Sequence, residues 1–236
     1  MLYLIGTGLN DEFDLSLKAI EILKKCDEVY FEFYTSLSRI NIFNLEKLIN
    51  KKIIKVNRSF VEERAEELIK KAQNRDIALL IIGHPLIATT HSIFLENPNV
   101  KVIHNYSIIN AISITGLELY KFGRIVSIPF HESKSYIEYI RKNLSANLHT
   151  LILLDLKTEE NKFMNINEAL IKLSDFKEHK FVACCALATE DEKIYYGSYE
   201  KLLNIDFEKK PKPQCLILPS SLHFVEEELL SRYIIN

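Results

Sequence analysis

The chain opens with Met1-Leu2-Tyr3-Leu4-Ile5-Gly6-Thr7-Gly8-Leu9, an apolar run that stops at two glycines. Further along the chain, short apolar runs alternate with amphipathic stretches, so we predict that residues 2–5 form a buried strand. The glycines predict a tight turn at the carboxyl end of this strand, where open α/β sheets bind their ligands. The opening stretch therefore favours an α/β fold with a ligand site at the end of its first strand.

The glycine turn lacks the third glycine of a dinucleotide-binding loop. Asp11 stands at that position, and a carboxylate there would repel a pyrophosphate and prevent the close approach of the backbone. A dehydrogenase that binds NAD is therefore disfavoured.

The first half of the chain continues the alternation of strands and helices and predicts a mainly parallel sheet. Further strands are predicted at 29–31, 77–82 and 100–103. Asp14 is predicted to cap a helix that ends near residue 25, Ser59 and Glu62 form a predicted capping box, and residues 108–120 are predicted as a helix.

The second half reads as a separate α/β unit. A break at Phe122-Gly123 predicts an N-terminal α/β domain, 1–121, and a C-terminal α/β domain, 122–236. In the second domain we predict strands at 125–128, 150–154, 181–186 and 215–218, and helices at 134–144, 167–173 and 224–230. Glu226, Glu227 and Glu228 on the last helix are predicted to form a solvated face.

Composition indicates a folded protein without a broad charged surface. Of the 236 residues, 47% are hydrophobic and 26% are charged, which is enough apolar material for a substantial core. Thirty Lys and Arg against 32 Asp and Glu give a net charge of -2, which predicts no binding to nucleic acid or to an anionic membrane. Without a leader or a long apolar span, we expect a soluble, cytoplasmic protein.

Neither the cysteines nor the histidines indicate a metal site. The four cysteines contain no CxxC pair and are expected to be reduced and mostly buried. His84 and His91 have no carboxylate or thiol at ligand spacing, so we predict no metal.

Three internal stretches carry a more specific signal. They are Gly-His-Pro-Leu-Ile-Ala-Thr-Thr-His at 83–91, Val-Ile-His-Asn-Tyr-Ser-Ile at 102–108, and the segment 115–123 with Thr-Gly-Leu at its start and Tyr-Lys-Phe-Gly at its end. Together with the opening glycine turn, they resemble the diphthine synthases, the methyltransferases of diphthamide biosynthesis. Shorter agreements at 32–36, 148–151, 154–157 and 222–223 extend the resemblance over nearly the whole chain, in the family's order.

The resemblance implies a fold, a cofactor and a set of contacts. The fold is that of the tetrapyrrole methylases, with two α/β domains, S-adenosylmethionine in the cleft between them, and usually a homodimer. Carried over residue by residue, the cofactor contacts fall on Leu9, Ile87, Ser107, Ile108, Leu154 and Ala188, with His84 and Gln214 at two altered positions. Without the resemblance, the apolar members would be assigned to the core and Ser107 to a helix cap.

The implied activity is methylation of the amino group of a 3-amino-3-carboxypropyl histidine on translation elongation factor 2. Methyl transfer from a sulfonium to a neutral amine requires alignment and no metal, and the sequence assigns no catalytic base. The number of methyl groups transferred stays open. Two alternatives stay open as well: a tetrapyrrole methylase of the same fold, and a protein that binds S-adenosylmethionine without turnover.

Three substitutions relative to the family pattern motivate the second alternative. His84 stands in place of an aspartate, Leu187 in place of an arginine, and Gln214 in place of a histidine. The first removes a carboxylate with two acceptor oxygens and the second removes a fixed positive charge, so both could weaken cofactor binding.

Overall fold

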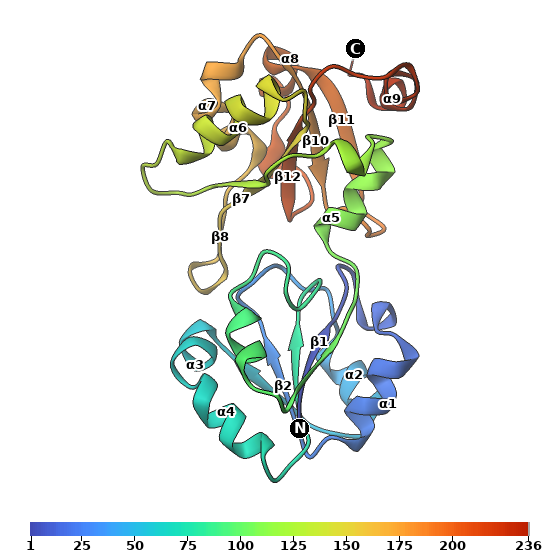
Figure 1. Cartoon of the computed structure of the whole chain (residues 1–236). Coiled ribbons are helices and arrows are strands. Elements are labelled where there is room, and N and C mark those ends of the chain that lie inside the picture. Colours follow the sequence, from blue (N-terminus) through green and yellow to red (C-terminus); the bar gives the residue numbers. More distant parts are fainter. Residues whose placement is uncertain (236) are drawn as a thin grey trace. The chain divides into compact units, whose positions relative to one another are not determined.

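The computed structural model describes residues 1–235, without the side chain of Glu62. The chain divides into two compact units, Met1–Asn110 and Ala111–Asn236. Each unit combines helices with its own five-stranded sheet (Figure 1). The predicted pair of α/β domains is therefore confirmed.

The first sheet is entirely parallel, with the strand order β3-β2-β4-β1-β5. The edge strand β3 was not predicted, because two of its four residues are exposed and its apolar pattern is weak. The other four strands were predicted, with small differences at their ends. The strands are β1 (Leu2–Gly6), β2 (Glu28–Glu32), β3 (Ile53–Val56), β4 (Ile77–Ile81) and β5 (Val100–Ile103).

Helices cover both faces of this sheet. Figure 1 shows α1 (Leu17–Lys25) and α2 (Ile42–Ile49) on one side and α3 (Arg58–Glu63) and α4 (Ala65–Ala72) on the other. Because side chains alternate along a strand, Ile5 packs toward α1 and α2 whereas its neighbour Leu4 packs on the α4 side. Burial on both faces explains why the central strands β1 and β4 are continuous apolar runs.

The predicted cap of α1 is wrong. Ser16 is the N-cap, and its hydroxyl oxygen accepts a hydrogen bond from the Ala19 N–H at 3.1 Å. The Asp14 carboxylate instead turns back to the glycine loop, where it accepts the N–H groups of Leu9 and Asn10. The helix consequently begins at Leu17.

Helix α3 also has a cap other than the predicted one. The side-chain oxygen of Asn57 accepts the Phe60 N–H at 3.0 Å, and Ser59 lies inside the first turn. The predicted capping box also involves the side chain of Glu62, which lies outside the described part of the chain.

The second sheet has the order β11-β10-β12-β7-β6 and is mainly antiparallel, with one parallel pair, β6 and β7. β11 was not predicted, because only two of its six residues are buried and it contains a glycine. The strands are β6 (Val126–Ile128), β7 (Thr150–Leu154), β10 (Lys180–Cys185), β11 (Lys193–Ser198) and β12 (Gln214–Leu218), and a separate hairpin joins β8 (Leu156–Lys157) to β9 (Lys162–Phe163).

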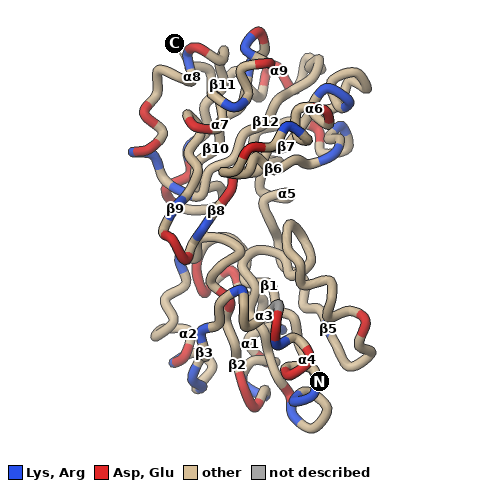
Figure 2. The backbone as a smooth tube through the Cα atoms, turned by 90° about the vertical axis from the view of Figure 1, so that its left-hand side faces the viewer, with Lys and Arg blue, Asp and Glu red and all other residues tan. Residues whose placement is uncertain are grey.

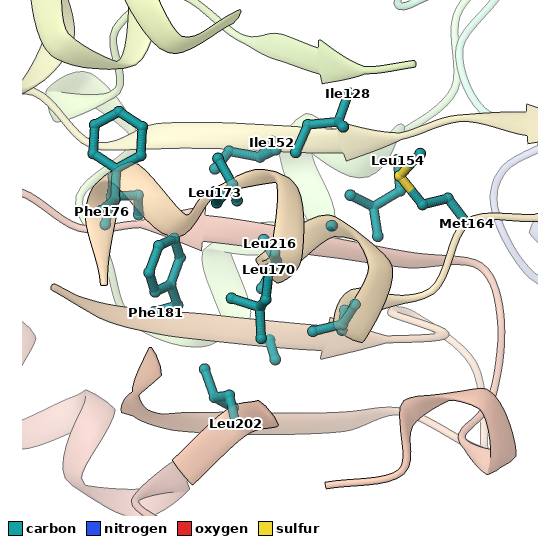
Figure 3. Close-up of a cluster of buried hydrophobic side chains, with 14 of the residues drawn as sticks. Ile128, Ile152, Leu154, Met164, Leu170, Leu173, Phe176, Phe181, Leu202 and Leu216 are labelled. Atoms are coloured by element: carbon teal, nitrogen blue, oxygen red, sulfur yellow. The ribbon is translucent and has the colours of Figure 1, made fainter. Parts of the chain in front are cut away.

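The core of the second unit lies between this sheet and three helices, α6 (Ser135–Ser145), α7 (Ile166–Lys172) and α8 (Tyr199–Leu203). Figure 3 shows Phe181 and Leu216 from the sheet near Leu170 and Leu202 from the helices. All four side chains are fully buried. Burial of this apolar surface is the main term that stabilises the unit.

The segment predicted as a helix over 108–120 is broken into shorter turns. It contains α5 (Ile108–Ala111), then two 3-10 turns, and Gly116 in left-handed conformation with φ of 83°. Helix α9 (Phe224–Leu230) matches its predicted bounds. The 3-10 helices within residues 1–235 are η1 (Glu12–Asp14), η2 (His91–Glu96), η3 (Ile112–Thr115), η4 (Leu119–Lys121), η5 (Thr158–Glu160), η6 (Ser174–Phe176), η7 (Phe207–Lys209) and η8 (Ser231–Tyr233).

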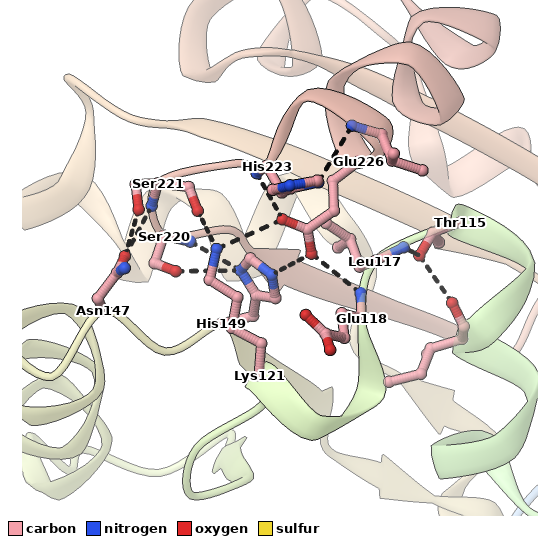
Figure 4. A network of polar contacts seen from close by, with 12 residues as sticks. Thr115, Leu117, Glu118, Lys121, Asn147, His149, Ser220, Ser221, His223 and Glu226 are labelled. Carbon is pink, nitrogen blue, oxygen red and sulfur yellow. Dashed lines mark hydrogen bonds and ion pairs between the residues drawn. The ribbon is translucent and has the colours of Figure 1, made fainter.

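A buried carboxylate on α9 holds the segment 112–121 in the second unit (Figure 4). Glu226 is 3% exposed. Its Oε1 accepts the Glu118 N–H and the His149 Nε2–H, both at 2.9 Å, and its Oε2 lies 3.3 Å from the Lys121 ammonium. The predicted solvated face is therefore wrong for Glu226, although Glu227 and Glu228 are exposed. Adjacent helical residues point in different directions, and only Glu226 faces this segment.

These contacts explain where the two units divide. Glu118 and Lys121 bind to α9, and Gly116 packs against Leu229 so closely that a Cβ would lie 2.4 Å from the leucine Cβ. The division therefore falls after Asn110, earlier in the chain than the predicted boundary after residue 121.

The bond between His149 and Glu226 joins a neutral ring to a charged carboxylate. His149 Nδ1 accepts the Ser220 N–H at 3.0 Å, so the ring proton lies on Nε2 and is donated to Glu226. Burial lowers the pKa of His149 in spite of its acidic partner. Burial opposes ionisation of Glu226 too, but hydrogen bonds from the Glu118 and His223 N–H groups and from His149 outweigh it and lower its pKa to about 2.

Charged residues of both signs are interspersed along each unit (Figure 2). Within residues 1–235, no helix is both long and apolar enough to cross a lipid bilayer.

Replacing Glu226 should destabilise the protein in a pH-dependent way. Glu226→Gln is expected to lower the free energy of unfolding by about 2–3 kcal/mol at neutral pH, because it removes a buried, hydrogen-bonded charge. The folded pKa is depressed, so this contribution is present above the ordinary value of 4.5 and is lost as the pH falls toward about 2. Denaturant titrations at several pH values measure the difference. Glu227→Gln on the same helix is the exposed control, and a Glu226 effect that stays constant with pH would contradict the assignment.

Candidate active site

The glycine turn after β1 is joined to the end of β4. Gly8 and Gly83 form an isolated bridge in which the Gly83 N–H donates to the Gly8 carbonyl at 2.8 Å and the Gly8 N–H donates to the Gly83 carbonyl at 3.3 Å. Both glycines are left-handed, with φ of 78° and 74°, a conformation that side chains with a Cβ adopt at a cost. The bridge fixes the turn predicted from the sequence at the carboxyl end of the sheet.

Leu9 and Ser107 gather around Gly83. A Cβ placed on Gly83 would lie 3.6 Å from Leu9 Cδ2 and 3.9 Å from the Ser107 Cα and Cβ. The loops that follow β1, β4 and β5 thus meet at Gly83, which has no side chain. The surroundings leave room there for at least one more carbon atom, so this cradle fits a ligand that contacts the backbone.

Ser107 also caps the helix that follows it. Its hydroxyl oxygen accepts the Ile109 N–H at 3.3 Å, and its own N–H donates to Asn110 Oδ1 at 3.1 Å. The side chain is buried. The capping role expected from the sequence is therefore present beside the position of the proposed ligand contact.

The two ring nitrogens of His84 are both engaged. Nδ1 accepts the Leu86 N–H at 3.1 Å, so the proton of the neutral ring lies on Nε2, which faces His104 Nδ1 at 2.8 Å. Burial, and then the neighbouring His104, lower the pKa of His84. The ring is therefore a neutral donor to His104. With both nitrogens engaged, His84 can offer a ligand only its ring carbons or its main chain.

Strained alanines lie at or next to three positions of interest: Ala188 is itself a predicted contact, Ala88 follows the predicted contact Ile87, and Ala186 precedes Leu187. Ala88, Ala186 and Ala188 have left-handed backbone, with φ of 56°, 46° and 63°. Glycine, asparagine and aspartate adopt this conformation readily, but for other residues it costs about 1 kcal/mol or more. Strain of this kind clusters at ligand sites. The strain independently marks the same two loops.

In the second unit, Leu154, Ala188 and Gln214 lie at one edge of the sheet. Gln214 pairs with Cys185 at the end of β10, and Cys215 pairs with Leu153 near the end of β7. Because these neighbouring strands are antiparallel, the end of β7, the end of β10 and the start of β12 share an edge. The Ala188 N–H donates to Glu192 Oε2 at 2.7 Å, which holds the strained loop.

The Gln214 side chain is largely occupied within the fold. It is buried, its oxygen accepts the Ile166 N–H at 3.0 Å, and its amide donates to the carbonyls of Phe207, Lys210 and Pro211. Four hydrogen bonds leave little capacity for a ligand. Its visible role is to fasten the start of β12 to the preceding connector.

Three polar residues that shape the first loop were not predicted in this role. Asp14 accepts two loop N–H groups, Tyr106 donates its hydroxyl to the same carboxylate, and Asn105 donates to the Gly6 and Asp14 carbonyls, both at 3.0 Å. Ser16 was a signal in the sequence, because serine is a preferred N-cap residue and it stands directly before the helix that begins at Leu17. Assigning the cap to Ser16 would have left Asp14 free for another role.

Glu32 is a further polar residue that was not predicted. It lies at the end of β2, fully buried, and accepts the N–H groups of Tyr34 at 3.1 Å, Thr35 at 3.0 Å and Ile82 at 3.2 Å. Burial raises its pKa, although these hydrogen bonds oppose the shift. The carboxyl group thereby ties the end of β2 to the residue that precedes Gly83.

No cluster of three or more His, Cys, Asp or Glu in the described residues is placed to hold a metal ion. All four cysteines are buried and free, as predicted.

Comparison with known proteins decides the family. The model of the family Tetrapyrrole (Corrin/Porphyrin) Methylases matches residues 1–203. A diphthine synthase of Methanococcus maripaludis is 38% identical, over 98% of this chain and 97% of its own length. A diphthine methyl ester synthase of Schizosaccharomyces pombe is 33% identical, over 100% and 95%. The chain belongs to the diphthine synthase family of tetrapyrrole methylases.

A solved structure agrees with this membership. The crystal structure of a diphthine synthase superposes with a TM-score of 0.91 at 32% identity and covers 99% of this chain and 96% of the other. A member of this family is a methyltransferase and requires a methyl donor. The resemblance identified from the glycine turn and the three internal stretches is thus confirmed.

Two glycine substitutions should separate steric conflict from backbone strain. A Cβ on Gly6 would lie 2.5 Å from the Gly83 carbonyl oxygen, so Gly6→Ala must displace main chain and is expected to cost about 3 kcal/mol. Gly83→Ala meets no contact closer than 3.6 Å and should cost about 1 kcal/mol, from its left-handed φ alone. Denaturant unfolding of both variants measures the difference. Equal losses would show that the strand ends are not as close as described.

Proposed function

We propose that the chain uses S-adenosylmethionine to methylate the amino group of the 3-amino-3-carboxypropyl histidine of translation elongation factor 2, in diphthamide biosynthesis. The similarity to diphthine synthases along the whole chain carries this proposal. The convergence of strand ends on Gly83 and the strained alanine loops support it, because they are features of ligand sites.

The proposed donor contacts are those that the family resemblance implies. They are Leu9, His84, Ile87, Ser107 and Ile108 in the first unit and Leu154, Ala188 and Gln214 in the second. Leu9, Ile87 and Ile108 are half-buried and would exclude water from the donor. His84 and Gln214 would contribute main chain or apolar surface, because their polar side-chain atoms are engaged elsewhere.

S-adenosylmethionine, when bound, supplies an electrophilic methyl carbon on a sulfonium. The residues of the chain would hold the substrate nitrogen in line with this carbon, and alignment of this kind supplies much of the rate of such a transfer. The nitrogen must be uncharged to attack, so its proton is lost to solvent before transfer. By the same resemblance we propose that two copies of the chain form a homodimer.

The number and position of the methyl groups can be read from mass. The protein is incubated with S-adenosylmethionine and with elongation factor 2 that carries the modified histidine, and the intact mass of the factor is measured. We expect increments of one methyl each. Mild alkali removes a methyl ester and leaves N-methyl groups, so treatment before a second measurement tells the two products apart. No increment with the modified factor, at saturating donor, would overturn the proposed activity.

A methyl group in the cradle at Gly83 should weaken donor binding more than it weakens the fold. Gly83→Ala is expected to raise the dissociation constant for S-adenosylmethionine by ~10-fold or more, because the added carbon occupies space assigned to the ligand. Calorimetry measures the change. Gly116→Ala, which strikes Leu229 in the second unit, is a destabilising control expected to leave affinity unchanged. Equal effects of the two variants on affinity would show that the donor does not bind at Gly83.

A further inference from the structure

Asp14 binds the loop after β1 through one carboxylate oxygen. Its Oδ2 accepts the Leu9 N–H at 3.0 Å and the Asn10 N–H at 2.8 Å. These N–H groups follow the glycine turn and belong to no strand or helix, so the carboxylate satisfies donors that would otherwise need water. The main-chain path of Leu9 is thereby fixed from the side of η1.

The same oxygen is connected to the loop after β5. The Tyr106 hydroxyl donates to Oδ2, and Asn105 Nδ2 donates both to the main-chain carbonyl of Asp14 and to that of Gly6. Burial, and then the Asp14 carboxylate, raise the pKa of Tyr106, so the phenol keeps the proton that it donates. Asp14 therefore joins the two loops that carry Leu9 and Ser107.

The glycine at position 8 is matched to this carboxylate. A Cβ on Gly8 would lie 2.6 Å from Asp14 Cβ and 2.7 Å from Asp14 Oδ2. The absence of a side chain at Gly8 is what allows Asp14 to approach the loop N–H groups. The conformation of the glycine turn and the position of the Asp14 carboxylate thus depend on each other.

We propose that Asp14 is a positioning residue of the methyl-donor site, which sets the spacing between Leu9 and Ser107 through the loop N–H groups and Tyr106. This inference rests on the proposed function, because it assumes that those two residues contact the donor. Asp14 acts through the loops and does not touch the reacting atoms. Its loss should therefore affect donor binding and leave the methyl-transfer step nearly unchanged.

The chain offers a matched control on the same 3-10 helix. Glu12 is buried, and its carboxylate accepts the Asn41 N–H and the Asn44 Nδ2–H, both at 2.9 Å. These bonds hold the start of α2 and not the glycine loop. Glu12→Gln thus removes a comparable hydrogen-bonded carboxylate from the same element without changing the groups that hold Leu9 and Asn10.

The test compares Asp14→Asn, Tyr106→Phe, their double variant and Glu12→Gln in the full chain. Calorimetry with S-adenosylmethionine should show a dissociation constant raised ~10-fold by Asp14→Asn, the loss expected for weakened charge-assisted hydrogen bonds. Tyr106→Phe should give a smaller increase, and the double variant less than the product of the two, because both act through one oxygen. KM for the donor should rise while kcat changes less than ~2-fold.

Amide hydrogen exchange supplies a second readout that needs no donor. Asp14→Asn should accelerate exchange at Leu9 and Asn10, whereas Glu12→Gln should accelerate it at Asn41. If the unchanged protein binds no S-adenosylmethionine, the proposed function falls, and this inference with it. Two other results would overturn the positioning role alone, provided that the unchanged protein binds the donor. Either Asp14→Asn binds the donor as tightly as the unchanged protein, or Asp14→Asn and Glu12→Gln bind it with the same affinity.

Discussion

Three carboxylates that accept main-chain N–H groups hold connecting segments between the regular elements. Asp14 and Glu32 do so in the first unit and Glu226 in the second. A loop N–H that is removed from water needs an acceptor, and a carboxylate offers several lone pairs from one short side chain. Each of these residues therefore holds main chain that lies beyond the paired part of the strands. The geometry of the candidate site depends on the first two.

Burying such groups has a cost that the hydrogen bonds must offset. Glu32 shows the balance, because burial raises its pKa even though three N–H groups face it. Glu226 shows the opposite result, since its neighbours lower its pKa to about 2. The difference follows from the partners: Glu226 also faces an ammonium group and a histidine, whereas Glu32 faces the neutral side chain of Thr35 beside its main-chain donors. Both arrangements favour one conformation of the loops over alternatives that would leave the carboxyl group without donors.

The sequence predicted the parts of the fold that depend on local pattern. β1 and β4 are buried on both faces, so their runs of apolar residues are unambiguous, and the glycine turn after β1 has the signature of a strand end. β3 and β11 were missed because few of their residues are fully buried, which weakens the apolar pattern. The bonds by which Asp14, Glu32 and Glu226 join distant segments could not be predicted, because one partner of each lies far away in the chain. Tyr106 is 92 residues from Asp14, and Glu118 is 108 residues from Glu226. The apolar site residues were found only through the family resemblance, since a leucine beside a strand is by default a core residue.

The attachment of residues 112–121 to α9 determines which crossover points between related genes would preserve the fold. A hybrid that joined the first half of one relative to the second half of another after residue 121 would combine a Glu118 N–H from one parent with a Glu226 carboxylate from the other. A crossover just before Ala111 would inherit both ends of that bond from a single parent. Recombination during evolution of the family should therefore be tolerated best at this earlier seam, which no glycine or proline in the sequence marks.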